Sequence, residues 1–329
     1  RSFYLTLAVL PASVRTQVGL AYLFARAADT ITDTDLIEQS ERIVHLKNFQ
    51  KLFTLDAIDW EIVQSIQASL ISHQALPAER ILLERLKDCF QAYLECELSD
   101  RIRINDLMTT LTKGMEMDLE LFQGSTPENI ISLETQDDLN RYTYYVAGCV
   151  GEYWTNLMCA HLPSLNKWDV EQMSNIGISF GKGLQLTNIV KDVAKDLNRG
   201  RCYIPTSLLK TAGLSPNDIL QTQSWKSFQP ILNTLIQQAA EYLNQGWEYT
   251  TAIPRSEVRL RLSCMWPILL GGETLKLVRN SPNVLNPNYQ IKITRSCVYK
   301  VISLTTISGG SNLIGTIYWK KLYNQLVIA

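Results

Sequence analysis

The sequence YLFARAADTITD, residues 22–33, continues an apolar helical pattern and adds charged residues to it. Just upstream, Val14 and Val18 recur at the spacing of one face of an α-helix. Asp29 and Asp33 are four residues apart, so a helix places their carboxylates one above the other, about 6 Å apart at Cβ. Burying such a pair without partners would be costly, and the stretch therefore predicts a helix with a ligand-binding face.

Arg26 and Tyr22 extend this face towards the N-terminus, one helical turn at a time. The stripe then holds a phenol, a guanidinium and two carboxylates within an Ala- and Leu-rich helix. A single pair of aspartates at this spacing is also typical of an ordinary solvated helix face. That alternative stays open for this stretch on its own.

A second stretch, QLTNIVKDVAKD at residues 185–196, repeats the pattern. Its oxygen-bearing side chains step by three, four and four along one helix face: Gln185, Asn188, Asp192 and Asp196. Two such faces opposed across a helical bundle would hold a hard divalent cation, Mg²⁺ or Mn²⁺, with substrate phosphates completing the shell. Cationic side chains near the two stretches would neutralise phosphate oxygens: Arg26, Lys191, Arg199 and Arg201. The two stretches together favour magnesium–diphosphate chemistry.

A third stretch, residues 142–152, sets three tyrosines before small residues. The small residues Ala147, Gly148 and Gly151 let a helix approach either a neighbouring helix or a long ligand closely. Sequence alone leaves both readings open.

The rest of the chain is also helical in its period, and turn signals such as residues 124–127, 162–164, 213–216 and 281–288 separate the segments. We expect one all-α domain over residues 1–329, with about ten helices around a common interior. Besides the helix that holds residues 14–28, the expected helical segments are 36–53, 61–73, 78–99, 102–122, 137–161, 169–197, 227–250, 256–279 and 294–325.

Composition narrows the function classes. Lys and Arg number 31 against 32 Asp and Glu, which is not the strongly basic balance of a nucleic-acid binder. The seven cysteines are scattered and include no C-x-x-C, which is typical of reduced thiols in a cytosolic protein. No signal peptide and no apolar run of membrane-spanning length is present. The first residue is not Met, so we also expect trimming at either end of the chain, and a C-terminal membrane anchor is one segment that trimming would remove.

At these motifs the sequence resembles the squalene/phytoene synthase family, the head-to-head trans-isoprenyl synthases, over nearly its whole length. The shared motifs run from residues 1–4 through 22–33, 145–151 and 185–196 to 200–205. Within the family, Cys264-x-x-Pro267 and the basic segment from Lys292 to Arg295 resemble squalene synthases. The chain departs from the pattern at Lys195, where an acidic residue is common, and at Lys191, where Arg is common.

The resemblance implies a helical bundle of the isoprenoid synthase type with a central active-site cavity. It implies two farnesyl diphosphates joined with Mg²⁺ into presqualene diphosphate, which NADPH reduces to squalene. The implied metal ligands are Asp29, Asp33, Asn188, Asp192 and Asp196; the acid/base is Tyr145; the cofactor phosphate is held by Lys292 and Arg295. The implied substrate-binding residues are Arg1, Ser2, Phe3, Tyr22, Arg26, Val146, Gly148, Gln185, Lys191, Arg201, Cys264 and Pro267.

Two alternatives to squalene synthesis stay open. One is a non-reductive relative that makes phytoene, dehydrosqualene or presqualene diphosphate, in which case Lys292 and Arg295 begin an ordinary solvated helix. The other is a non-catalytic scaffold of the same family, which the four intact motif aspartates disfavour. We expect a monomer that is cytoplasmic or peripherally attached to a membrane, with membrane contact serving product release and no nucleic-acid partner.

Overall fold

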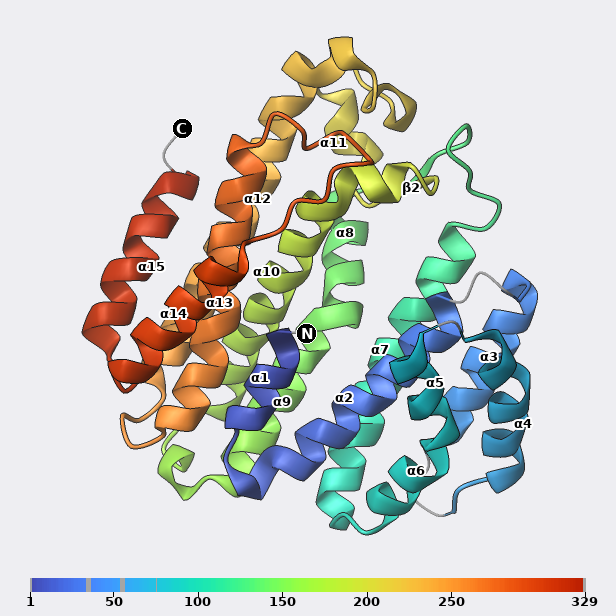
Figure 1. Ribbon diagram of the computed structural model, residues 1–329, viewed down its shortest axis with the longest axis vertical. Coiled ribbons are helices and arrows are strands. Elements are labelled where there is room, and N and C mark those ends of the chain that lie inside the picture. The colour runs from blue at the N-terminus through green and yellow to red at the C-terminus, as the bar shows by residue number, and fades with distance from the viewer. Residues whose placement is uncertain (1, 34–36, 54–56, 75, 328–329) are drawn as a thin grey trace.

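The computed structural model describes residues 2–33, 37–53, 57–74 and 76–327, and Figure 1 shows that this part of the chain is built of helices. The N-terminal α-helices are α1 (Ser2–Val9), α2 (Ala12–Asp33), α3 (Gln39–Lys51), α4 (Trp60–Leu70), α5 (Pro77–Glu84), α6 (Leu86–Leu94), α7 (Leu98–Leu121), α8 (Gln136–Thr143) and α9 (Cys149–His161). The others are α10 (Val170–Leu197), α11 (Thr206–Lys210), α12 (Trp225–Ala252), α13 (Val258–Asn280), α14 (Arg295–Ile307) and α15 (Asn312–Val327). The all-α prediction is confirmed.

Several expected helices are divided in the structure. The segment 78–99 breaks at Arg85, whose backbone leaves the helical region at φ −101° and ψ 15°. The segment 294–325 breaks at a turn in which Gly309 and Gly310 adopt positive φ, a conformation that glycine adopts without steric cost. Two-residue strands β1 (Ile131–Ser132) and β2 (Arg201–Cys202) pair in parallel, with Ile131 opposite Arg201. Among the described residues, no helix has the length and apolar composition needed to cross a bilayer.

The helices gather around two hydrophobic clusters. The first is formed mainly by α2–α7 and α9, and the second by α10, α12, α13 and α15. Phe180 of α10 packs against both clusters. The long helix α10 packs against α9, α12 and α13, so it lies in the middle of the molecule. Its face that carries Gln185 and Asn188 is therefore held among neighbouring helices.

Helices α9 and α10 approach one another at glycines. A Cβ atom on Gly151 would overlap the backbone of Gly177 across the contact. Gly148 is buried nearby, where it faces Tyr144 and Ile178. The small residues at 148 and 151 thus serve helix packing, as one of the two sequence readings proposed.

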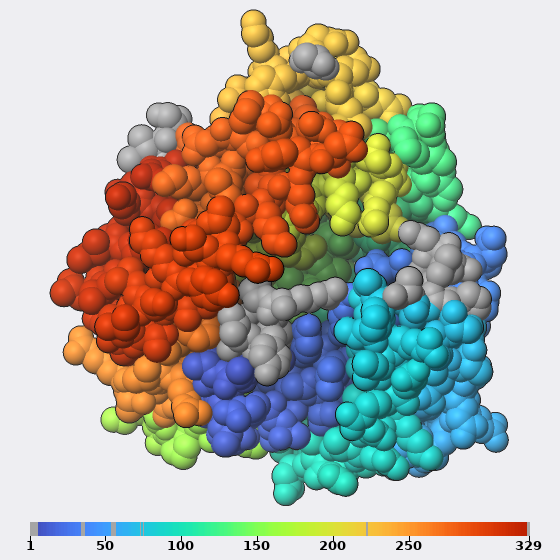
Figure 2. Space-filling view, viewed as in Figure 1, coloured from blue at the N-terminus to red at the C-terminus, as the bar shows by residue number. Residues whose placement is uncertain are grey.

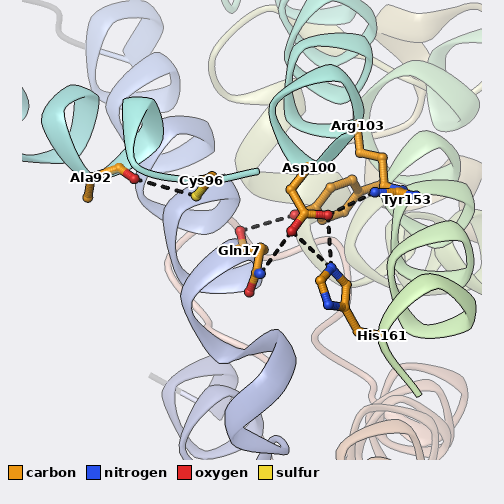
Figure 3. Close-up of polar contacts among 7 residues, drawn as sticks. All are labelled: Gln17, Ala92, Cys96, Asp100, Arg103, Tyr153 and His161. Atoms are coloured by element: carbon orange, nitrogen blue, oxygen red, sulfur yellow. Dashed lines mark hydrogen bonds and ion pairs between the residues drawn. The ribbon is translucent and has the colours of Figure 1, made fainter. Parts of the chain in front are cut away.

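A buried carboxylate ties α2 to α7 and α9 (Figure 3). Asp100 of α7 is fully buried and accepts hydrogen bonds from Gln17 Nε2 (2.9 Å) and Arg103 Nη1 (2.8 Å). His161 of α9 places its Nε2 2.9 Å from both carboxylate oxygens. The Tyr153 hydroxyl of α9 donates to the backbone carbonyl of Gln17 at 3.0 Å. These bonds fix the position of α2, the helix that carries Asp29 and Asp33.

Candidate active site

A cavity of about 560 Å³ lies between α2, α7, α8, α9 and α10. Figure 2 shows the molecule hollowed near the centre of the view, with atoms of the green, middle part of the chain visible in the depth. The polar lining residues come from these five helices and from the β2 segment: Tyr22, Arg26, Asp29, Thr32, Asp33, Asp118, Tyr142, Tyr153, Gln185, Asn188, Arg201 and Tyr203. The structure thus brings the first aspartate stretch to the beginning of the second one.

On α2, the two aspartates form a crowded anionic pair. Burial raises the pKa of Asp29 to about 6, the charge of Asp33 adds to that rise, and Arg26 opposes it. The Arg26 Nη1 atom lies 3.3 Å from Asp29 Oδ2, and the guanidinium also pairs with Glu79 of α5. The sequence reading did not include Glu79, because it lies about fifty residues away on another helix.

On α10, only the first two of the four oxygen-bearing side chains of the second stretch lie at the cavity. Gln185 and Asn188 line the cavity, whereas Asp192 and Asp196 lie one and two turns farther along and are not lining residues. Burial raises the pKa of Asp196 to about 7, and the charge of Asp192 adds to the rise. The Lys191 ammonium lies 3.1 Å from Asp192 Oδ2 and donates to Asn188 Oδ1 at 3.3 Å.

A third acidic residue joins the site from α7. Asp118 Oδ2 accepts a hydrogen bond from Arg201 Nη1 at 3.0 Å, and its Oδ1 accepts one from the Tyr203 hydroxyl at 2.6 Å. Burial raises the pKa of Asp118, and Arg201 and Tyr203 oppose that rise. The rings of Tyr203 and Tyr142 are stacked with centroids 4.8 Å apart. The charge of Asp33 acts on both Asp118 and Arg201, so this cluster faces the α2 pair.

Sequence reasoning missed Asp118, although a signal was present. Leu107, Leu111 and Gly114 are buried at helical spacing, and Asp118 continues that face by one more turn. An acidic residue on an otherwise apolar face is the same anomaly that singled out Asp29.

The donor set suits Mg²⁺ that binds together with phosphate. Among the residues described, no group of three or more Asp, Glu, His or Cys side chains could hold a metal ion by itself. Aspartate pairs on α2 and α10 are present, and each includes one carboxyl whose pKa the partner's charge raises. Mg²⁺ is commonly held by one or two carboxylates plus substrate phosphates, and the residues fit that mode.

Two further pockets continue from the cavity along α10. A small apolar pocket of about 180 Å³ shares Val146, Val150 and Trp154 with the cavity and ends at Cys264 and Pro267. Burial raises the pKa of the Cys264 thiol to about 12, so this cysteine serves as an apolar wall. Gly151 also lines this pocket. The small residues therefore border apolar space as well as a neighbouring helix, which is compatible with the second interpretation from the sequence, close approach of a long ligand.

The basic pair predicted for a cofactor lies in a neighbouring pocket of about 510 Å³. Exposed Lys292 and Arg295 line it together with Lys191, Asn188 and Pro267. The structure therefore brings the basic pair next to both the second aspartate stretch and the Cys264–Pro267 wall.

Other predicted residues lie elsewhere. The structure does not bring Tyr145 to the cavity: Tyr145 lines a separate pocket, where its ring packs beside Lys113 of α7, with the Lys113 Nζ 5.6 Å from the ring centroid. The cavity face carries Tyr142, Val146 and Val150 at intervals of four, and Tyr145 is one residue off that face. This stretch includes a π-helical turn, Tyr144–Gly148. Arg1 lies outside the described residues, and Ser2 and Phe3 are described only by their place in α1.

Comparisons with known proteins agree with this fold. The model of the squalene/phytoene synthase family matches residues 1–297. A bifunctional lycopene cyclase/phytoene synthase of Pyrenophora tritici-repentis is 28% identical over 91% of this chain and 47% of its own length. The squalene synthase of Saccharomyces cerevisiae is 26% identical over 94% of this chain and 65% of its own length. The chain thus spans about half the length of the phytoene synthase relatives that it matches.

Among solved structures, a ligand complex of TcSQS aligns with a TM-score of 0.75 at 20% identity, covering 99% of this chain and 94% of that one. A dehydrosqualene synthase aligns with a TM-score of 0.62 at 21% identity, covering 93% and 91%. At such identities the likeness concerns the fold.

Proposed function

The chain belongs to the squalene/phytoene synthase family, and we propose that it acts as a squalene synthase. It would join two farnesyl diphosphates into presqualene diphosphate and reduce that product with NADPH to squalene. The observation that carries this proposal is one continuous arrangement: an acidic and cationic cavity opens into apolar space, which adjoins a basic pocket. A diphosphate, a prenyl chain and a phosphorylated cofactor need these three environments.

The first half of the reaction needs a leaving group to be stabilised. We assign the metal to Asp29 and Asp33 on α2 and to Asn188, Asp192 and Asp196 on α10. Mg²⁺ bound there would stabilise negative charge on the departing diphosphate. Arg26, Lys191 and Arg201 would contact the diphosphate oxygens through charge-assisted hydrogen bonds.

The allylic cation left behind must be kept from water. Val146, Val150 and Trp154 line both the cavity and the apolar pocket, so the prenyl chain would extend along them towards Cys264. An aliphatic and aromatic wall offers no nucleophile to the cation, and it excludes the water that would trap the cation as an alcohol.

Closure of the cyclopropane requires loss of a proton. The sequence prediction assigns this step to Tyr145, but among the three tyrosines of the third stretch the one that lines the cavity is Tyr142. Burial raises the pKa of Tyr142 well above its usual value, and the charges of Tyr203 and Asp118 add to the rise. We therefore propose that Tyr142 acts as a neutral phenol that hydrogen-bonds to the diphosphate, and that the diphosphate oxygen accepts the proton.

The second half of the reaction needs a reductant. We propose that Lys292 and Arg295 hold the 2′-phosphate of NADPH in the pocket that they line with Lys191 and Pro267. This would place the cofactor beside the Cys264–Pro267 wall and the prenyl chain. The basic pocket is the feature that favours a reductive enzyme over its non-reductive relatives.

Phytoene synthases are among the relatives. The experiment therefore compares farnesyl diphosphate with geranylgeranyl diphosphate as the substrate. Purified protein is incubated with Mg²⁺ and either farnesyl or geranylgeranyl diphosphate, with and without NADPH, and the products are extracted. Squalene that forms only with farnesyl diphosphate and NADPH supports the proposal. Phytoene, or C30 products that do not change with NADPH, would assign the chain to the non-reductive branch, and no condensation product at all would favour the scaffold.

A further inference from the structure

Exposed aliphatic side chains gather at the turn between α14 and α15, outside the site described above. We call these five residues the α14–α15 tip: Leu304, Ile307, Leu313, Ile314 and Ile317. Their side chains are exposed to 38%, 87%, 70%, 38% and 63%, respectively. Figure 1 shows α15 at the outer edge of the molecule, with the turn pointing away from its centre. Large aliphatic side chains that stay exposed close together in the chain point to an interaction surface.

The charged residues in the same part of the chain are all basic. The sequence contains no Asp or Glu after Glu273, so all 32 acidic residues lie in the first 273 positions. Seven cations follow Glu273: Lys276, Arg279, Lys292, Arg295, Lys300, Lys320 and Lys321. Residues 274–329 therefore carry only positive formal charges, although the net charge of the 329 residues is −1.

The cations and the aliphatic residues are ordered along each helix. On α14, exposed Lys300 precedes Leu304 by four residues and Ile307 by seven, so all three share a face. On α15, exposed Lys320 and Lys321 follow Ile317 by three and four residues. Each helix thus presents aliphatic side chains at the turn and ammonium groups one turn or more behind it.

The inner side of these helices is firmly attached to the body. Buried Arg261 of α13 donates to the Gly310 carbonyl from Nε (3.1 Å) and Nη2 (3.0 Å), within the turn itself. The indole of Trp266 donates to Thr305 Oγ1 at 2.9 Å, and that of Trp247 donates to Thr316 Oγ1 at 3.1 Å. Hydrogen bonds to α12 and α13 therefore hold the inner side of the α14–α15 tip in place, and its aliphatic side chains are on the exposed side.

We propose that the α14–α15 tip inserts into the interfacial layer of an anionic lipid bilayer, with Lys300, Lys320 and Lys321 on the lipid phosphates. The aliphatic side chains at the turn suit the acyl boundary of such a bilayer, and the lysines behind them suit its anionic headgroups. A second copy of this chain is a poorer occupant, because two tips face to face would bring their lysines together. The inference does not depend on the reaction proposed above.

Flotation with lipid vesicles tests this surface. The triple variant Ile307→Ser/Leu313→Ser/Ile317→Ser is compared with Val44→Ser/Leu76→Ser/Ile81→Ser, whose aliphatic side chains are exposed to 56%, 53% and 54% on α3, at the N-cap of α5 and on α5. Vesicles contain phosphatidylcholine alone or with about one-third phosphatidylglycerol. We expect wild type and the control variant to bind the anionic vesicles, and the tip variant to bind at least about tenfold more weakly.

A charge variant separates the two contributions. Lys300→Gln/Lys320→Gln/Lys321→Gln should abolish the preference for anionic over neutral vesicles, and circular dichroism melting confirms that each variant folds. The proposal is overturned if wild type does not bind anionic vesicles, or if the tip and control variants bind equally. It is also overturned if sedimentation shows a wild-type dimer that the tip variant loses, because the tip would then be covered by a second copy.

Discussion

Asp118 of α7 holds Arg201 of β2 through a hydrogen-bonded ion pair of 3.0 Å, at the wall of the cavity that both residues line. The two residues are 83 positions apart, and the pair is half-buried, with side-chain exposures of 15% and 27%. A guanidinium held from behind by a carboxylate keeps its remaining N–H groups directed at an incoming anion. On the proposed function, we infer that Asp118 positions Arg201 for diphosphate binding.

We therefore expect Asp118→Asn to weaken diphosphate binding while the fold is kept. Loss of one charge-assisted contact, worth about 1.5–3 kcal/mol, should raise the KM for farnesyl diphosphate about tenfold or more. Steady-state kinetics measures this, with Asp106→Asn on the exposed side of α7 as the matched control. An unchanged KM, together with an unchanged melting temperature, would show that Asp118 does not act through Arg201.

The metal assignment predicts a loss of turnover without a loss of folding. Asp29→Asn and Asp192→Asn each remove a charge from an anionic pair, so turnover with Mg²⁺ should be abolished. The pKa of Asp29 is raised to about 6, so its charged form costs stability, which falls as the pH rises through that value. At pH 8 without metal, the melting temperature of Asp29→Asn should equal or exceed that of wild type. Near-normal turnover in either variant would refute the assignment.

The tyrosines of the third stretch give a direct comparison. Tyr142→Phe removes the hydroxyl that lines the cavity, and we expect a loss of about 10²–10⁴-fold in the formation of presqualene diphosphate. Tyr145→Phe is the matched control in the structure, since its ring lines another pocket, and it should lose less than about threefold. The opposite order of losses, measured by single-turnover product analysis, would restore the sequence-based assignment of the acid/base to Tyr145.

Local sequence patterns predict the all-α fold class and the spacing of the motif residues. The helical period of α2 and α10 and the spacing of Asp29, Asp33 and Asn188 are properties of short segments, and they were predicted in place. Contacts between distant segments, such as Arg26 with Glu79, are set by helix packing and leave no local signal. The division of 294–325 into two helices was missed although Gly309-Gly310 is a local turn signal, and both glycines adopt positive φ in the turn.

The Asp100 network predicts a pH-dependent stability. Burial alone would raise the pKa of Asp100, but hydrogen bonds from His161 and Gln17 and the charge of Arg103 outweigh it and hold the pKa below its ordinary value. The ionised carboxylate therefore stabilises the fold above about pH 4, and this contribution is lost as the pH falls through the folded-state pKa. Asp100→Asn should lower the free energy of unfolding by about 2–4 kcal/mol at pH 7.

Urea unfolding at pH 7 and at successively lower pH measures this difference. It should shrink below about pH 4, as wild-type Asp100 itself becomes protonated. A cost of Asp100→Asn that stays constant across the whole range would mean that packing, and not the ionised carboxylate, ties α2 to α7 and α9.

The basic pocket gives the prediction that separates the reductive enzyme from its relatives. Lys292→Ala/Arg295→Ala should still form presqualene diphosphate from farnesyl diphosphate, because neither residue lines the diphosphate cavity. Loss of two charge-assisted contacts, at about 1.5–3 kcal/mol each, should raise the half-saturating NADPH concentration at least tenfold and release non-reduced C30 products in place of squalene. Lys210→Ala/Lys226→Ala, two exposed lysines outside this pocket, is the control. Squalene yield is followed against NADPH concentration in the three proteins. If the half-saturation point is unchanged, Lys292 and Arg295 only begin a solvated helix, and the case for reduction would rest on Cys264 and Pro267 alone.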